Sequence, residues 1–153
     1  RKMGGPGFQD FVIEKPEHSP HYEYEKYDAD DPRSHRRAVY RFLVRSQQEP
    51  FMAALDCADP SMRVDRRNES LSALQALALL NNDFMVAMAR HFAEKLERSG
   101  GDLAAQVERG VYEALGRPAT AEEKDALTRY ARKYGLANLC RVLFNLNEFA
   151  FVD

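Results

Sequence analysis

The second half of the chain carries apolar residues at helical spacing with few interruptions. From residue 83 to residue 149 they recur every three or four positions, which is the period of one helix face. Glycines at 100–101, 116 and 135 divide this pattern, and Asp102 and Thr120 are good helix-start residues. We therefore expect helices over residues 83–99, 102–115, 120–134 and 136–149, with Asp83 capping the first.

The most continuously apolar stretch precedes these helices. Ser72 and Gln75 have the spacing of a capping box, which predicts a helix start. The residues that follow, up to Leu80, are leucine and alanine apart from Gln75, so this short helix has no polar face. We expect it to be the buried centre of the domain, with Arg66 and Arg67 at its entrance and two asparagines at its end.

The first part of the chain lacks this helical spacing. Six of the seven prolines fall in the first 60 residues, which predicts an irregular front over residues 1–70 and a helical core over residues 71–153 of a single domain, 1–153. Residues 21–28 alternate aromatic and charged side chains, and residues 37–45 do the same if extended. One interpretation pairs these two stretches as a β-hairpin. The other is a helix opened by Asp31-Pro32. In both, Arg37, Arg41 and Arg45 share a face.

The predicted fold class is therefore mainly α, a compact multi-helix bundle around a buried central helix, with an irregular N-terminal third. The chain has 153 residues, 44% of them hydrophobic, which is enough to bury one core. A net charge of −2 argues against a nucleic-acid partner. No apolar run approaches the roughly 20 residues of a transmembrane helix. Cys57 and Cys140 are either two buried free thiols or one disulfide, and the sequence leaves both open.

Charged residues gather in the segment that leads into the apolar helix. Asp56, Asp59, Arg66 and Arg67 are the candidate binding residues there, because paired carboxylates can serve as acid and base and arginines can hold anions. The alternative is that they pair with one another and attach the segment to the helical core. We expect no metal at the loop histidines around Pro20, whose spacing does not fit a zinc site. The Gly4–Gly7 stretch is expected to be a turn.

Several motifs resemble those of a known family. They are Arg-Arg-Ala-Val-Tyr-Arg-Phe (36–42), Leu-Asp-Cys-Ala-Asp-Pro (55–60), Arg-Arg-Asn (66–68), Leu-Gln-Ala-Leu-Ala-Leu-Leu-Asn-Asn (74–82), Leu-Gly-Arg-Pro (115–118) and Leu-Phe-Asn-Leu-Asn-Glu-Phe (143–149). In this order they resemble the uncharacterised C-terminal domain of large exported planctomycete and verrucomicrobial proteins. That domain commonly follows another uncharacterised domain and, further upstream, a planctomycete-type c-type cytochrome domain. By this likeness, the chain starts inside the domain.

The resemblance implies a context and no catalytic residues. It implies export, a periplasmic or cell-surface location, upstream domains of the same polypeptide as partners, and polysaccharide as a further partner. Any haem would belong to another domain, so we expect no cofactor in this chain. An oxidising compartment would favour a Cys57–Cys140 disulfide. The expected function is a non-catalytic helical docking module, and the alternative is part of an extracytoplasmic carbohydrate-binding or hydrolytic protein with a site near residues 56–67.

Overall fold

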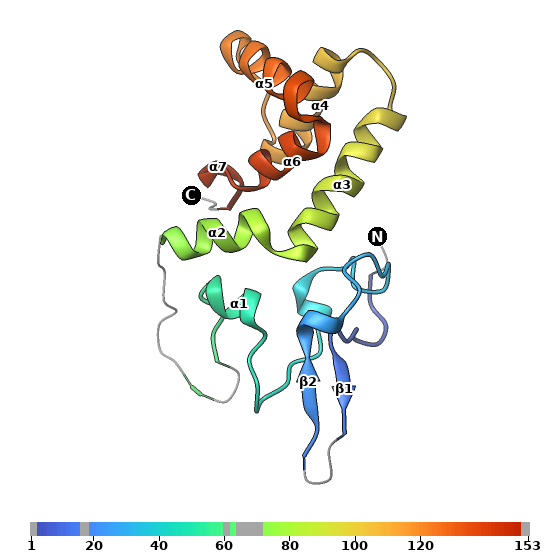
Figure 1. The fold of residues 1–153 in the computed structure, drawn as a ribbon, viewed down its shortest axis with the longest axis vertical. Coiled ribbons are helices and arrows are strands. Elements are labelled where there is room, and N and C mark those ends of the chain that lie inside the picture. Colours follow the sequence, from blue (N-terminus) through green and yellow to red (C-terminus); the bar gives the residue numbers. More distant parts are fainter. Residues whose placement is uncertain (1–2, 16–18, 60–61, 64–71, 151–153) are drawn as a thin grey trace. The chain divides into compact units, whose positions relative to one another are not determined.

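A computed structural model describes residues 3–15, 19–59, 62–63 and 72–150. Its described part is mainly α, as predicted, with one short hairpin near the N-terminus (Figure 1). The α-helices are α1 Pro50–Ala54, α2 Ala73–Asn81, α3 Asp83–Arg98, α4 Leu103–Leu115, α5 Ala121–Tyr134, α6 Leu136–Phe144 and α7 Asn147–Ala150. The chain forms two compact units, unit 1 over residues 1–75 and unit 2 over residues 76–153. A single domain over 1–153 stays a prediction.

The helices of unit 2 begin and end at the residues that local chemistry favours. The Asp102 side chain accepts a hydrogen bond from Ala105 N at 2.8 Å and caps α4, which ends at Gly116 with φ 74°. Thr120 and Glu123 form the predicted capping box of α5. The cap of α3 is one residue earlier than predicted, because the Asn82 side chain takes the Phe84 amide and Asp83 becomes the first helical residue.

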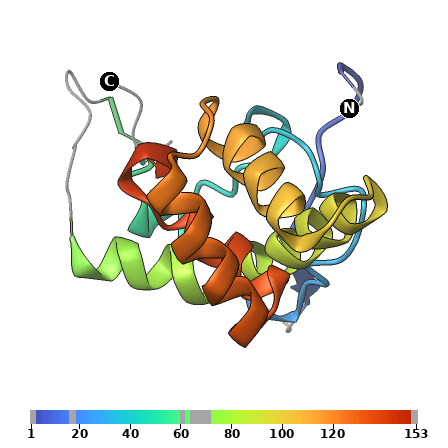
Figure 2. The same ribbon diagram turned by 90° about the horizontal axis from the view of Figure 1, so that it is seen from above.

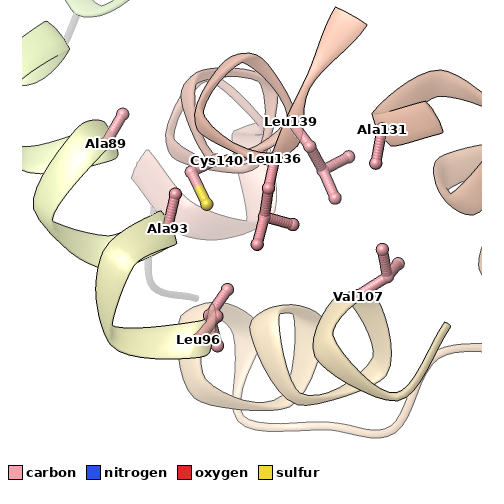
Figure 3. Packing of buried hydrophobic residues seen from close by; sticks show 8 residues of the cluster. All are labelled: Ala89, Ala93, Leu96, Val107, Ala131, Leu136, Leu139 and Cys140. Carbon is pink, nitrogen blue, oxygen red and sulfur yellow. The ribbon is translucent and has the colours of Figure 1, made fainter. Parts of the chain in front are cut away.

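Helix α6 is the centre of unit 2, where it contacts α3, α4, α5 and α7 (Figure 2). Its inward face carries Leu136, Leu139 and Cys140, and the last two have no exposed surface. Figure 3 shows these side chains between small or branched residues of three other helices. Those neighbours are Ala89, Ala93 and Leu96 of α3, Val107 of α4 and Ala131 of α5. The alanines bring α3 close to α6, so the larger side chains can fill the core.

Glycine also permits a close helix approach. Gly110 is buried in α4, and a Cβ there would lie 3.1 Å from Leu96 Cδ1 and 3.6 Å from Leu143 Cδ1. The missing side chain therefore makes room for one leucine from α3 and one from α6.

The predicted final helix over residues 136–149 is wrong in its extent. Helix α6 ends at Phe144, Asn145 leaves the helical conformation with φ −100° and ψ 1°, and α7 starts at Asn147. Phe149, the last residue of the apolar pattern, is 36% exposed. Asparagine competes with the helical backbone for hydrogen bonds, and this accounts for a break where apolar spacing alone predicted continuity.

Helix α2 forms as predicted, but its predicted burial is wrong. The described capping box joins Ser72 and Gln75 through two bonds of 3.1 and 3.2 Å. Leu74 is 67% exposed and Leu77 is 55% exposed, and the buried residue of the helix is Gln75. An apolar helix is buried only where other elements cover it. In unit 2, the helix that the others surround is α6.

The hairpin of unit 1 pairs different residues from those predicted. Strand β1, Val12–Glu14, runs antiparallel to β2, His21–Glu23, with Ile13 opposite Tyr22. Residues 37–45 are instead a 3-10 helix, Ala38–Tyr40, followed by an isolated bridge between Arg41 and Phe8. The ring of Phe11 packs edge-on against Tyr22, Tyr24 and Phe42. This aromatic cluster stabilises the pairing of β1, which precedes β2 in the chain, with β2.

The Gly4–Gly7 stretch is a bend, as expected, and it is held by one arginine. Arg36 donates from Nη1 to Pro6 O at 2.8 Å and from Nη2 to Gly4 O at 2.7 Å, and its guanidinium lies 4.0 Å from the centre of the Tyr40 ring. The loop therefore presents carbonyl oxygens to a cation. None of the described helices is long and apolar enough to cross a membrane.

Candidate functional site

The predicted site residues are only partly within the described structure. Asp56 and Asp59 follow α1, whereas Arg66 and Arg67 lie outside the described residues. Asp56 adopts a left-handed conformation, with φ 58°. Its Oδ2 accepts a hydrogen bond of 2.9 Å from Nε2 of Gln75, which is 7% exposed. The described part of the site therefore brings Asp56 to the start of α2.

Gln75 uses both ends of its amide in this arrangement. Its Oε1 accepts from the Ser72 amide in the capping box, and its Nε2 donates to Asp56. A buried amide group costs free energy unless its donors and acceptors are satisfied. Asp56 therefore ties the end of α1 to the start of α2. Its pairing with Arg66 or Arg67 stays a prediction, because both arginines lie outside the described residues.

Two substitutions of Asp56 test its structural role. We expect Asp56→Ala to destabilise the chain by about 2 kcal/mol, because alanine tolerates a positive φ poorly and leaves the Gln75 amide without its acceptor. Asp56→Asn keeps an acceptor oxygen and a residue type that tolerates this conformation, so its cost should be below about 1 kcal/mol. Urea denaturation measures both. Equal losses from the two variants would contradict the structural role.

A second charged cluster, missed in the sequence, lies inside unit 1. Arg41 Nε is 2.9 Å from Asp10 Oδ2, and Arg41 Nη1 is 2.7 Å from Glu49 Oε2. The three side chains are only 11–14% exposed. Glu49 also caps α1, where its carboxylate accepts from the amides of Phe51 and Met52 at 3.0 and 2.7 Å. One buried arginine thus joins the segment before β1 to the start of a helix.

Burial and charge oppose each other in this cluster. Burial raises the pKa of Asp10 above its ordinary value, although the Arg41 charge acts to lower it. The pKa of the Tyr24 phenol is also raised, first by burial and then by the carboxylates of Asp10 and Glu49. Loss of a proton is therefore disfavoured at both groups. The ion pairs of Arg41 with Asp10 and Glu49, and not these pKa shifts, are the observation that indicates a structural role.

A pocket of about 140 Å³ lies beside this cluster within unit 1. Its walls are mostly side chains without charge or amide groups, from residues 38–44 and 52–58, and its polar members are Tyr24, Arg41, Gln47, Gln48 and Glu49. Phe42 and Leu43 line it and are 50% and 59% exposed. The pocket is thus an apolar hollow bordered by exposed apolar side chains, with a paired arginine in its wall.

The two cysteines are free thiols in different units. Cys57 is half-buried and lines the pocket. Cys140 lies in the core of unit 2, where burial raises its pKa to about 12, so this thiol stays protonated and unreactive near neutral pH. Among the described residues, no group of three or more histidine, cysteine, aspartate or glutamate side chains could hold a metal ion.

The sequence held a weak signal for the buried cluster. The spacing of Arg37, Arg41 and Arg45 put them on one face in either predicted conformation, but Arg37 and Arg45 are exposed and Arg41 is not. Val44 and Phe51, which are buried on either side of Glu49, are apolar positions that mark this part of the front as packed. An arginine and a glutamate within such a stretch were the available indication of an internal ion pair.

Comparison with known proteins identifies one family of unknown function. No curated protein and no solved structure matches the chain. A family model, described as PSD1, a protein of unknown function (DUF1553), matches residues 1–131. This match includes all of unit 1 and most of the helices of unit 2. The chain therefore belongs to the PSD1 family of proteins of unknown function (DUF1553).

Proposed function

We propose that this chain is a non-catalytic docking module of a larger exported protein, and that it binds an upstream domain of the same polypeptide. The context comes from the family resemblance: a periplasmic or cell-surface protein in which any haem belongs to another domain. The observation that carries the proposal is the contrast within unit 1 between charged groups that are engaged inside the fold and apolar side chains that are exposed around a pocket.

The engaged charges are the first half of this contrast. Arg41 forms ion pairs with Asp10 and Glu49, and Asp56 accepts a hydrogen bond from Gln75. An acid–base pair that acts on a substrate needs carboxylates that can reach it across an open groove. Carboxylates held by an arginine, by helix amides and by a buried glutamine are instead positioned to hold three segments of the chain together.

The exposed apolar side chains are the second half. Val39 is 78% exposed, Leu43 59% and Phe42 50%, and Phe42 and Leu43 border the pocket. Exposed apolar residues that border a hollow, as Phe42 and Leu43 do, are typical of a protein interface. Burying them against an upstream domain would remove this apolar area from water and supply the main free energy of docking.

The test is binding of this chain to the upstream part of the polypeptide, expressed separately, by isothermal titration calorimetry. We expect Leu43→Glu to weaken binding tenfold or more, because it places a charge among apolar contacts. The matched control is Leu77→Glu in unit 2, at a leucine of similar exposure, which should leave the affinity within about twofold. Absence of binding by the unsubstituted chain, or equal losses from both variants, would contradict the proposal.

The carbohydrate alternative has its own readout. A bound ligand at one hundred times its dissociation constant adds about 2.7 kcal/mol of stability, so thermal unfolding with neutral and sulfated oligosaccharides reports such a site. Under the docking proposal, no oligosaccharide shifts the unfolding temperature. A shift that Asp56→Asn removes would overturn it in favour of a sugar site near residues 56–67.

A further inference from the structure

We propose that the pocket of unit 1 receives one aromatic side chain of the partner, and that this side chain is flanked by acidic residues. The inference rests on the proposed docking function and names the chemistry that the partner must carry. Three observations lead to it: the size of the pocket, its apolar lining, and the charges that border the segment forming one of its walls.

The size of the pocket fits one ring. Its volume of about 140 Å³ is close to the roughly 150 Å³ of an apolar cavity that accepts benzene. A flat aromatic ring in such a space makes contact on both faces, whereas a water molecule there would find few polar partners. The occupant expected from volume alone is therefore a phenylalanine or tyrosine ring.

The lining agrees with an apolar occupant. Phe42, Leu43, Val44 and Met52 line the pocket together with the small Ala53. Methionine and aromatic side chains adapt well to an inserted ring. The charged wall residues Arg41 and Glu49 bond to each other at 2.7 Å, so they do not require a charged ligand to satisfy them. The remaining polar wall residues, Tyr24, Gln47 and Gln48, are uncharged, and Gln47 bonds to Tyr24 and to the Tyr22 carbonyl.

The charges at the border favour a protein segment over a free hydrocarbon. Arg37 and Arg45 flank residues 38–44 in the sequence, both are exposed, and no ion pair involves either of them within the described part of the chain. Three carboxylates of unit 1 already have partners. Asp10 and Glu49 form ion pairs with Arg41, and Asp56 accepts a hydrogen bond from Gln75. Arg37 directly precedes the lining residue Ala38 and Arg45 directly follows the lining residue Val44. Two cations at the ends of a wall segment are complementary to a ring that has carboxylates next to it.

The first experiment uses 3-phenylpropionate, which joins a ring to a carboxylate, and follows the methyl signals of Met52 and Ala53 by NMR. We expect saturable shifts with a dissociation constant of about a millimolar, as for a small fragment. Propionate, which lacks the ring, and phenethylamine, which carries the opposite charge, should each bind at least tenfold more weakly. Equal effects of phenylpropionate and propionate would overturn the assignment of a ring.

Two variants locate the site without disturbing the core. Ala53→Leu fills the pocket from an exposed position of α1, and Ala126→Leu, the same change at an exposed position of α5, is its control. We expect the first to abolish the probe shifts and the second to leave them unchanged. Arg37→Glu with Arg45→Glu should lower affinity at least fivefold and reverse its salt dependence, since the two introduced carboxylates would repel the carboxylate of the probe. Unchanged affinity in the double variant would overturn the acidic flank.

The upstream part of the polypeptide then separates this inference from the docking function. We expect Ala53→Leu to weaken its binding tenfold or more, with Ala126→Leu as the control. If Leu43→Glu weakens docking and Ala53→Leu does not, docking stands and the pocket assignment fails. If phenylpropionate binds the pocket but the upstream part does not bind the chain, the docking function fails and so does the partner assigned to the pocket.

Discussion

Leu139→Ala is expected to destabilise unit 2 by about 3–4 kcal/mol. The side chain of Leu139 has no exposed surface and lies in the cluster that joins α6 to α3, α4 and α5. Shortening it removes three carbon atoms from the core and leaves a cavity that the surrounding helices can only partly close. Urea denaturation followed by the helical circular dichroism signal measures the loss.

The control for this prediction is Leu77→Ala in α2. Leu77 is 55% exposed, so the same truncation should cost less than about 1 kcal/mol. The sequence predicted that the helix of residues 73–81 is the centre of the fold. Comparing the stability losses of the two variants tests whether this helix or α6 has that role. A Leu77→Ala loss equal to that of Leu139→Ala would contradict the arrangement in which α6 forms the centre.

The helices of unit 2 could be predicted because their start and stop signals are local. Asp102 caps the amide three residues later, Thr120 and Glu123 bond to each other's backbone, and Gly116 adopts the positive φ that ends α4. Each of these interactions joins residues only a few positions apart, so the chain sequence determines it directly. The break at Asn145 was missed because apolar spacing continues through it.

The choice of central helix could not be predicted in the same way. The stretch over 73–81 is more continuously apolar than residues 136–144, yet the second is the one that is surrounded. Burial depends on which distant helices present complementary surfaces. Here α3 contributes Ala89 and Ala93, and α4 contributes Gly110, at positions that face the larger side chains of α6. Such complementarity joins residues far apart in the chain and leaves no periodic signal in one segment.

The candidate site shows the same limit. The structural alternative for Asp56 was open from the sequence, but its partner Gln75 was assigned only to the capping box, and the structure uses both ends of that side chain. The pairing of β1 with β2 was missed because three residues are too few to show a strand period. In the sequence, Arg41 could not be distinguished from Arg37 and Arg45, which share its spacing. In the structure, ion pairs with Asp10 and Glu49 make Arg41 a largely buried cation.

Arg41→Met is expected to destabilise unit 1 by about 3–5 kcal/mol, the usual result when one member of a buried ion cluster is removed. Methionine fills much of the same space, so the loss comes mainly from charge. Without the guanidinium, the Asp10 and Glu49 carboxylates remain largely buried without their cation. The control is Arg45→Met, which makes the same change at an exposed position of the same segment and should cost less than about 0.5 kcal/mol.

The pH dependence of the Arg41→Met loss identifies its cause. The pKa of Asp10 is already raised by burial, against the lowering effect of Arg41, so removing the arginine raises it further. The folded variant then binds a proton more readily than the unfolded chain, and its stability falls as pH rises from the ordinary aspartate pKa of 3.8 through the raised folded value. The difference in unfolding free energy between variant and wild type should therefore be smaller at pH 4 than at pH 7. A difference that does not change with pH would show that lost packing, and not an uncompensated buried carboxylate, accounts for the effect.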